Sequence, residues 1–461
     1  MKMRIWQIGL FVLHAACNHN SMNPGYEGVK TFYINGWDAK ASDSNSGLSA
    51  SWDSTTKSGP FKTISRAMSL LEPGDVAYVR AGVYAESGLR FSHSGEKNAA
   101  ITLSAYATDT GFESVVIDGS GAAAGTNGIL IDRDQNFIVL KGLEIRNMPN
   151  AGIATDESTR HRGIVIENAV VRGNGVGIGL SKTDEFKLTS VRACENAEEG
   201  IRLISSNNGS ITNSEACRNQ AGFHLIASSN NRLEGNSATG NGVAGFVLES
   251  NSNNNTLREN VSGKNQAEDG FTIAGSYGNL LTGNEAYGNG KRGMQFTDQS
   301  QNNRIENNLA HDNGVLGFAI YVESIKNTLR ANTSHSNRFH GFVFLAGASE
   351  NTVTENRSYD NCRSGFYFEN ANKNEFLDNR AYDNGFDGFT MFLGSDGNHF
   401  LNNTAERNTG WGFLSDFDSP NDSLATGNSA LLNSAGQFGE VAFESIDFAA
   451  YTDISNPWDC R

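Results

Sequence analysis

Residues 222–241 read GFHLIASSNNRLEGNSATGN, and residues 317–337 read GFAIYVESIKNTLRANTSHSN. In both stretches, three short segments alternate between apolar and polar residues, and Asn, Gly and Ser separate them. Alternation over four or five residues predicts a strand, and clusters of Asn and Gly predict turns. Each stretch therefore predicts three short strands joined by tight turns.

This pattern recurs along most of the chain. A glycine followed by an apolar residue returns every 22 to 25 residues, at Gly128, Gly152, Gly177, Gly200, Gly222, Gly245, Gly270, Gly293, Gly317, Gly341, Gly365, Gly388 and Gly412. A period this short is typical of a solenoid, in which one coil buries its core only by stacking on the next. The sequence predicts an all-β, single-stranded parallel β-helix of thirteen or more coils. We expect right-handed coiling, because right-handed parallel crossovers dominate.

Asparagines and phenylalanines form columns at the same spacing. The asparagine columns run from Asn231 to Asn398, from Asn236 to Asn428 and from Asn241 to Asn408. Asparagine tolerates left-handed turn geometry, and stacked amides bond one another, so we predict structural ladders, with a polar binding surface as the alternative. The phenylalanine column, from Phe223 to Phe413, follows the repeat glycine and is predicted to stack inside the core; ligand stacking is its alternative.

The start of the chain predicts export. Residues 1–17 begin with Lys2 and Arg4, continue with a short apolar run, and end at Cys17, which is typical of an export signal. The residues before Cys17 resemble the lipobox of bacterial lipoproteins, although His14 departs from it. Lipid attachment at Cys17 and simple cleavage both stay open. We expect a protein that is secreted, at the cell surface or in the periplasm, with an outer-membrane lipoprotein as one form.

The remaining boundaries follow the repeat. Residues 18–30 are predicted to be a linker, 31–120 an N-terminal cap with the first coils, 121–433 the repeats and 434–461 a C-terminal cap. Within the N-terminal cap, Ile64, Ala67, Met68 and Leu71 share a helical face, and a proline and glycine at 73–74 should end that helix. A solenoid must cover its open end, so we expect a capping helix there.

The net charge limits the classes of binding partner, and the cysteine spacing predicts a contact between two coils. The net charge of −15 argues against a nucleic-acid partner, and we expect a monomer. A polyanionic substrate would need local basic residues or a cation to offset repulsion. Cys194 and Cys217 occupy matching positions one coil apart, where a disulfide or two stacked thiols both fit.

Several segments resemble a known group of proteins. The runs SDSNSG at 42–47, PFKTI at 60–64, PGDVAYVRAGVYAE at 73–86 and VIDG at 116–119 resemble the opening of secreted right-handed β-helix proteins of the pectate-lyase-like group. The later coils are similar to the asparagine-rich coils of that group and of the periplasmic repeat protein of nitrous oxide reductase maturation. The resemblance implies a β-helix that interacts with a polysaccharide.

One motif of the group is matched in part. Its pectate lyases carry Asp-Gly-Phe on a groove-facing strand, followed by a lysine base, with aspartates that hold calcium. Here Asp269 begins such a motif, but Ala274 stands at the lysine position, and residues 291–294 read KRGM where those enzymes have further acids. This difference weighs against calcium-dependent cleavage by that set of residues.

Alternation along the strand after each repeat glycine exposes one stripe of side chains. This stripe is rich in charged and aromatic residues. From it we predict catalytic residues Arg202, His224 and Arg292, metal ligands Glu249 and Asp269, and substrate-binding residues Tyr321, His340, Tyr367, Glu369 and Trp411. A solvated polar face without a site is the alternative.

The chemistry of uronic sugars motivates these roles. Lyases and epimerases remove the proton alpha to a uronic carboxylate, and they neutralise that carboxylate with a cation or an arginine. Carboxylate oxygens suit Ca²⁺, which is the cofactor we predict. We therefore expect a protein that binds a polysaccharide, and that cleaves it by β-elimination or epimerises it. A non-catalytic adhesive protein and a periplasmic maturation or scaffolding protein are the alternatives.

Overall fold

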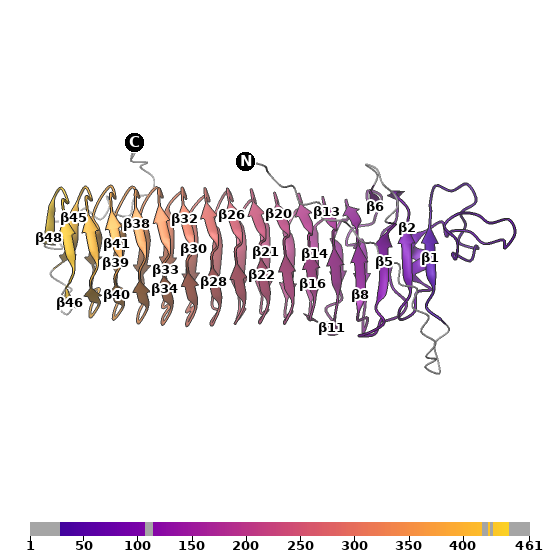
Figure 1. The fold of residues 1–461 in the computed structure, drawn as a ribbon, viewed down its shortest axis with the longest axis horizontal. Coiled ribbons are helices and arrows are strands. Elements are labelled where there is room, and N and C mark those ends of the chain that lie inside the picture. The colour runs from indigo at the N-terminus through magenta and orange to yellow at the C-terminus, as the bar shows by residue number, and fades with distance from the viewer. Residues whose placement is uncertain (1–27, 107–113, 417–422, 425–426, 442–461) are drawn as a thin grey trace, which may run out of the picture.

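The computed structural model describes residues 28–106, 114–416, 423–424 and 427–441. These residues form a straight rod of stacked coils in which three parallel sheets run along the long axis (Figure 1). Each strand pairs with its counterpart one coil away, as in the register of Phe223 with Phe246. The parallel β-solenoid predicted from the repeat is confirmed.

Sheet 1 contains sixteen strands. They are β1 (Thr31–Ile34), β2 (Val76–Val79), β5 (Ile101–Ala105), β8 (Ile138–Lys141), β12 (Val165–Glu167), β16 (Lys187–Thr189), β19 (Ser210–Thr212), β22 (Arg232–Glu234), β25 (Thr256–Arg258), β28 (Leu280–Thr282), β31 (Arg304–Glu306), β34 (Thr328–Arg330), β37 (Thr352–Thr354), β40 (Glu375–Leu377), β43 (His399–Leu401) and β46 (Ser423–Leu424).

Sheet 2 contains fifteen strands and includes the segment after each repeat glycine. They are β4 (Leu89–Arg90), β7 (Ile129–Ile131), β10 (Ala151–Thr155), β14 (Val176–Ser181), β18 (Glu199–Ile204), β21 (Ala221–Ile226), β24 (Ala244–Glu249), β27 (Phe271–Ala274), β30 (Arg292–Thr297), β33 (Leu316–Ile320), β36 (Phe342–Leu345), β39 (Phe366–Glu369), β42 (Phe389–Phe392), β45 (Trp411–Asp416) and β48 (Gly436–Val441). Strand β48 extends the sheet beyond residue 433, and residues 442–461 lie outside the described part.

Sheet 3 also contains fifteen strands. They are β3 (Gly82–Tyr84), β6 (Val115–Asp118), β9 (Leu143–Arg146), β13 (Val170–Arg172), β17 (Arg192–Cys194), β20 (Glu215–Cys217), β23 (Ser237–Thr239), β26 (Val261–Gly263), β29 (Glu285–Tyr287), β32 (Leu309–His311), β35 (Thr333–His335), β38 (Arg357–Tyr359), β41 (Arg380–Tyr382), β44 (Thr404–Glu406) and β47 (Ser429–Leu431).

The core is a set of columns, one side chain per coil. Phe223, Phe246 and Phe271 are fully buried, and their rings stack with centroids 4.7 Å apart. Met294 takes the next position, and a second phenylalanine stack begins at Phe318. Burying such a side chain contributes roughly 1.5–3 kcal/mol, and ring stacking adds to it. The predicted core role of this column is confirmed.

The asparagine columns are buried ladders that join successive coils. The side-chain amide nitrogen of Asn241 donates to Oδ1 of Asn265 at 3.0 Å, and the backbone N–H of Asn241 donates to the same oxygen at 3.0 Å. The amide nitrogen also donates to the carbonyl of Ala216 at 3.2 Å. These amides therefore stabilise the turns from inside, which confirms the structural interpretation.

The left-handed backbone conformation lies one residue before this ladder asparagine. Lys264, Asp312 and Ser336 have φ angles of 56°, 54° and 55°, and each precedes an asparagine of the same column. The expectation that the ladder asparagine itself takes this conformation is wrong for this column. The preceding residue makes the bend, and the asparagine that follows turns its amide inward.

A disulfide links two coils of sheet 3. Cys194 and Cys217 are register partners, their Cα atoms are 4.5 Å apart, and their sulfurs are bonded. The predicted adjacency is confirmed, and of the two alternatives left open by the sequence the structure has the disulfide.

The N-terminal helix is shorter than predicted. Helix α1 spans Ile64–Met68, and its Ile64, Ala67 and Met68 side chains are buried against β1, β2 and β4. The backbone N–H of Leu70 donates to the carbonyl of Ala67, three residues back, so the chain leaves the helix in a tight turn before Leu71. A role for α1 as the cap of the solenoid stays a prediction. Within the described residues, no helix is long and apolar enough to span a membrane.

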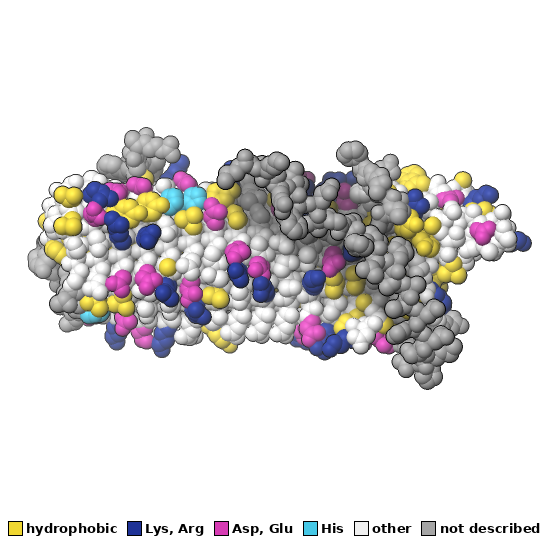
Figure 2. All heavy atoms as spheres, in the orientation of Figure 1, with side chains coloured by type: hydrophobic (Ala, Val, Ile, Leu, Met, Phe, Trp, Pro, Cys, Tyr) yellow, Lys and Arg dark blue, Asp and Glu magenta, His cyan; other side chains and the backbone are white. Residues whose placement is uncertain are grey.

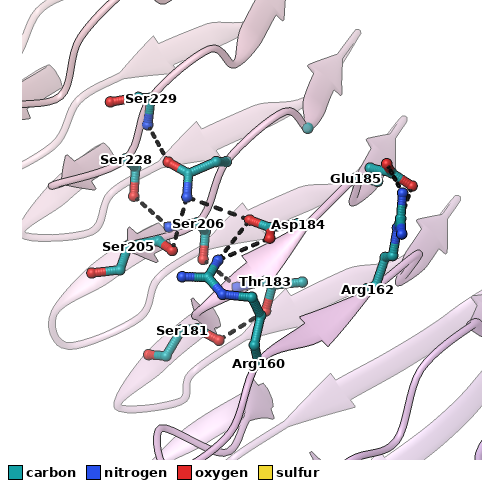
Figure 3. A network of polar contacts seen from close by, with 12 residues as sticks. Arg160, Arg162, Ser181, Thr183, Asp184, Glu185, Ser205, Ser206, Ser228 and Ser229 are labelled. Carbon is teal, nitrogen blue, oxygen red and sulfur yellow. Dashed lines mark hydrogen bonds and ion pairs between the residues drawn. The ribbon is translucent and has the colours of Figure 1, made fainter.

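A longer loop after β10 adds a small sheet at the edge of the rod. Strand β11 (His161–Arg162) pairs with β15 (Thr183–Asp184). Arg160 Nη1 lies 2.9 Å from both carboxylate oxygens of Asp184, and Arg162 pairs with Glu185 (Figure 3). Because the arginines are about half exposed, these ion pairs contribute little to stability.

Candidate functional site on the outer face of sheet 2

Charged side chains gather on the outer face of sheet 2 between β18 and β33. The residue after the repeat glycine points into the core, so the next residue points outward. The register places Arg202 beside His224 and Thr272 beside Gln295 on successive coils. We call this surface the polar face; its members are Glu198, Glu199, Arg202, His224, Glu249, Glu268, Asp269, Thr272, Lys291, Arg292, Gln295 and Tyr321.

His224 lies between two carboxylates. Its Nδ1 is 3.2 Å from Oε1 of Glu199, and its Nε2 is 3.2 Å from Oε1 of Glu249 in an ion pair without hydrogen-bond geometry. Burial lowers the pKa of His224, but the hydrogen bond with Glu199 and the two negative charges outweigh burial, so its pKa is raised. The two carboxylates therefore favour the protonated form of His224.

Arg202 flanks this cluster. Its Nη1 is 3.3 Å from carboxylate oxygens of both Glu198 and Glu199, and its Nε is buried without a hydrogen-bond partner. Burial raises the pKa of Glu199, but the contacts with His224 and Arg202 lower it by a larger amount. The net shift of the Glu199 pKa is therefore downward. Glu199 is thus held as a carboxylate between two cations.

A second cluster surrounds Arg292. Asp269 Oδ2 is 3.3 Å from Arg292 Nη1, and Asp269 Oδ1 accepts the backbone N–H of Arg292 at 3.1 Å. Thr272 Oγ1 donates to Asp269 Oδ2 at 3.3 Å, and the Arg292 guanidinium lies 5.2 Å from the ring centre of Tyr321. The Arg292 side chain is 24% exposed, so a ligand can reach it beside the tyrosine.

Burial dominates the titration of this second cluster. It raises the pKa of Asp269, and the opposing effect of Arg292 does not cancel the rise. Burial also raises the pKa of Tyr321 despite the same arginine. Tyr321 therefore stays a phenol at neutral pH and can donate a hydrogen bond or a proton. Asp269 is buried, so the expectation that it faces solvent is wrong.

The predicted metal ligands do not form a calcium site. Glu249 contacts His224, whereas Asp269 is balanced by the Arg292 guanidinium, which would repel a cation. Within the described part of the chain, the group of three side chains with metal-ligand spacing is Cys194, Glu215 and Cys217. Its two cysteines are joined by the disulfide. The donor set as it stands does not fit Ca²⁺.

The predicted substrate-binding residues beyond Tyr321 lie on a different kind of surface. His340 is 1% exposed and Tyr367 is 3% exposed, and their rings stack with centroids 4.6 Å apart. The Tyr367 hydroxyl donates to Oε2 of Glu369 at 3.1 Å, and Trp411 is half-buried. The expectation that His340 and Tyr367 are exposed is wrong.

The reason is an apolar cluster on the outer face of the later coils. It consists of Leu316, Ala319, Val343, Tyr367, Phe392 and Leu414, with Trp411 packed against it. From Arg202 to Gln295 the outer column is polar except at Val247, and from Ala319 onward it is apolar apart from Tyr367 and Thr390. The single stripe predicted from the sequence is therefore two surfaces: the polar face and this apolar cluster.

The sequence reasoning missed one column of the polar face. Lys291 Nζ lies 2.6 Å from Oε1 of Glu268, and Glu198 contacts Arg202. Glu198, Glu268 and Lys291 stand two positions before a repeat glycine, and the prediction stopped one position before it. Charged residues at that position were the available signal.

Two family models match the chain. The model "Pel9A-like, right handed beta helix region" matches residues 47–342, and the model "Periplasmic copper-binding protein (NosD)" matches residues 298–410. No curated protein matches the chain.

The chain is similar to several solved structures at low sequence identity. The A-module of the mannuronan C-5 epimerase AlgE4 of Azotobacter vinelandii is 16% identical, with 80% of this chain and 88% of that chain covered and a TM-score of 0.36. Pectate lyase Pel9A is 20% identical, with 76% and 77% covered and a TM-score of 0.31. The GH136 lacto-N-biosidase of Eubacterium ramulus is 13% identical, with 89% and 68% covered and a TM-score of 0.42.

Proposed function

Because the chain belongs to the Pel9A-like family of right-handed β-helix proteins, we propose that it binds a polysaccharide along the polar face of sheet 2. The observation that carries this proposal is the placement of Arg202, His224 and Arg292 on one outer face within five successive strands. A polysaccharide chain that follows the rod would meet these groups in turn.

The charges of the polar face fit a ligand that carries carboxylates. The chain has a net charge of −15, so an acidic polysaccharide needs local cations to approach it. Arg202, His224, Lys291 and Arg292 supply them, and arginine binds carboxylates in a bidentate, charge-assisted geometry. Uronate polysaccharides are therefore the ligand class that we propose.

Lyase or epimerase activity is the second candidate, and the contact between Arg292 and Tyr321 favours it. In both reactions a proton leaves the carbon alpha to the carboxylate, while a cation stabilises the developing charge. In this candidate mechanism, Arg292 neutralises the carboxylate and Tyr321 donates a proton. His224 and Tyr321 both have raised pKa values, which suit proton donors better than a base. Binding is for this reason the better supported function.

The test compares two double variants of the full chain. Arg202→Ala with Arg292→Ala should weaken binding to polygalacturonate and to alginate by at least about tenfold, as expected for the loss of two charge-assisted contacts. The control is Arg232→Ala with Arg304→Ala on sheet 1, because both arginines are exposed and pair with a glutamate of their own strand. Ultraviolet absorbance of unsaturated products would report β-elimination in the same samples. Equal affinities for both double variants would contradict the proposal.

An extracytoplasmic location accompanies this function. The export signal predicted at residues 1–17 lies outside the described residues, and the family match over 298–410 bears the name of a periplasmic protein. We propose secretion or retention at the cell envelope, with lipid on Cys17 as one means of retention. Fractionation of cells that express the wild type and Cys17→Ala would test both points. A maturation or scaffolding role stays the alternative function.

A further inference from the structure

A groove of about 600 Å³ lies at the corner between sheet 1 and the outer face of sheet 3. Three successive coils line it: Ala331 and Thr333 from the first, Glu355 and Arg357 from the second, and Asp378 and Arg380 from the third. The first coil has Ala331 and Thr333 where the next two coils have larger, charged side chains, and this difference leaves the hollow. The groove is on a different sheet from the polar face.

Two arginines stand side by side in this groove. Arg357 and Arg380 are direct register partners on β38 and β41, and like charges in that position destabilise a sheet. Arg380 Nη2 lies 2.7 Å from Oε2 of Glu406, whereas Arg357 forms no ion pair with any residue that the structure describes. Both side chains are exposed. Folding does not need this arrangement, so a bound anion is its most direct explanation.

The two acidic residues in the groove differ in whether an arginine neutralises them. Glu355 is held by Arg330, whose Nε lies 3.2 Å from its Oε2. Asp378 forms no ion pair among the described residues, and it opposes an anion from the wall of the groove. Removing the Asp378 charge should therefore change anion binding in the direction opposite to removing an arginine.

A stacked aromatic column runs beside the arginines on the outer face of sheet 3. The rings of Tyr287, His311, His335, Tyr359 and Tyr382 stack with centroid distances of 5.8, 5.0, 4.8 and 4.9 Å. In Figure 2, a stripe of yellow and cyan side chains runs along the rod toward its C-terminal end, with dark-blue side chains beside it. Because the ring faces cover one another, the column presents ring edges with hydroxyl and imidazole groups.

The column also positions one of the arginines. The Arg380 guanidinium lies 4.6 Å from the ring centre of Tyr382, which adds a cation–π contact to its ion pair with Glu406. A guanidinium held on two sides loses little freedom when it binds a ligand. The groove thus combines Arg380, which is ion-paired, with Arg357, which has no ion pair among the described residues, and with a row of hydrogen-bonding groups.

We propose that this groove is a second glycan-binding site, which holds carboxylates of a uronate polysaccharide that lies along the rod axis. Arg357 and Arg380 bind the carboxylate, and the polar edges of the aromatic column bind hydroxyl groups. Equivalent positions recur at the coil spacing of about 4.8 Å, so the site matches a repeating chain. The ligand class is the one that the proposed function names, but the residues and the sheet are independent of it.

Binding of polygalacturonate to variants of the full chain tests this site. Arg357→Ala with Arg380→Ala should weaken binding by at least about tenfold, as expected for two lost charge-assisted contacts. Asp378→Asn should strengthen binding several-fold, because it removes the opposing charge. Neither change should alter binding of the fully methyl-esterified polymer, and Arg232→Ala with Arg304→Ala on sheet 1 is the control. If the double variant does not fold, Arg357→Gln alone tests the same contact.

Three results would overturn the proposal. The first is unchanged affinity in both the double variant and Asp378→Asn. The second is inorganic sulfate that displaces the polymer at the same concentration as free galacturonate units, which would indicate a small-anion site. The third is a dimer in sedimentation that the double variant abolishes, which would assign the groove to a second copy of the chain. If only the sheet 2 variants lose binding, this inference fails and the proposed function stands; if only the sheet 3 variants lose it, the reverse holds.

Discussion

Asp387 provides a quantitative test of how the outer face of sheet 2 is packed in the later coils. Its side chain is fully buried at the position before the repeat glycine. Oδ1 accepts the backbone N–H of Trp411 at 2.7 Å, and Oδ2 accepts the hydroxyl of Thr390 at 2.9 Å. Burial raises the pKa of Asp387 to about 6, and these two hydrogen bonds offset only part of that rise.

The raised pKa makes stability depend on pH in a defined direction. The folded chain holds the proton more tightly than the unfolded chain does, so the contribution of Asp387 is complete below about pH 4 and is lost as the pH rises through about 6. The difference between about 6 and the ordinary value of 3.8 corresponds to about 3 kcal/mol. Above about pH 6, the buried carboxylate therefore destabilises the fold by up to that amount.

Asp387→Asn removes the titration and keeps the shape. The amide oxygen still accepts the Trp411 N–H, and the amide nitrogen donates to Thr390, whose hydroxyl lies 2.8 Å from that of Ser364. We expect the variant to be more stable than the wild type by up to about 3 kcal/mol at about pH 8 and equal to it near pH 4.

Urea unfolding at several pH values measures this difference. Because solenoids can unfold in segments, the quantity to compare is the urea concentration at the unfolding midpoint, measured at each pH. Asp360→Asn is the control, since Asp360 is an exposed aspartate on another face. A variant at position 387 that is less stable than the wild type at about pH 8, or that keeps the pH slope of the wild type, would refute the reasoning.

Three further predictions concern the ladders and the polar face. His224→Gln should reduce stability at about pH 5 and reduce it less at about pH 8, because the raised pKa gives a contribution that is lost as the pH rises; urea midpoints measure it. Asn332→Ala leaves two buried ladder donors without an acceptor and should cost about 2–4 kcal/mol, against less than about 0.5 kcal/mol for the exposed Asn150→Ala, by the same assay. Chelation with EDTA should leave polygalacturonate affinity unchanged in calorimetry, because Arg292 already balances Asp269; a loss of affinity would restore the calcium prediction.

The repeat made the interior predictable. A period of 22 to 25 residues leaves few ways to place an apolar residue in every coil, so the phenylalanine stack and the ladders followed directly. The adjacency of Cys194 and Cys217 followed from the same register. These features depend on spacing within one chain, which the sequence shows in full.

The outer faces were less predictable, because alternation says which way a side chain points but not what lies beside it. His340 and Tyr367 point outward as expected, yet they are buried among apolar neighbours. Asp269 is buried, and its carboxylate contacts Arg292 and Thr272. The ladder neighbours Lys264 and Ser336 adopt a conformation that their residue types rarely favour, so composition gave no signal for it.

The two proposed glycan surfaces differ in how many contacts within the folded chain a ligand must break. On the polar face, Arg292 is paired with a buried carboxylate and His224 lies between two glutamates, so a ligand carboxylate has to compete with contacts that also stabilise the fold. In the groove of sheet 3, Arg357 has no ion pair to break among the described residues. An acidic polysaccharide should therefore engage the groove first at low concentration.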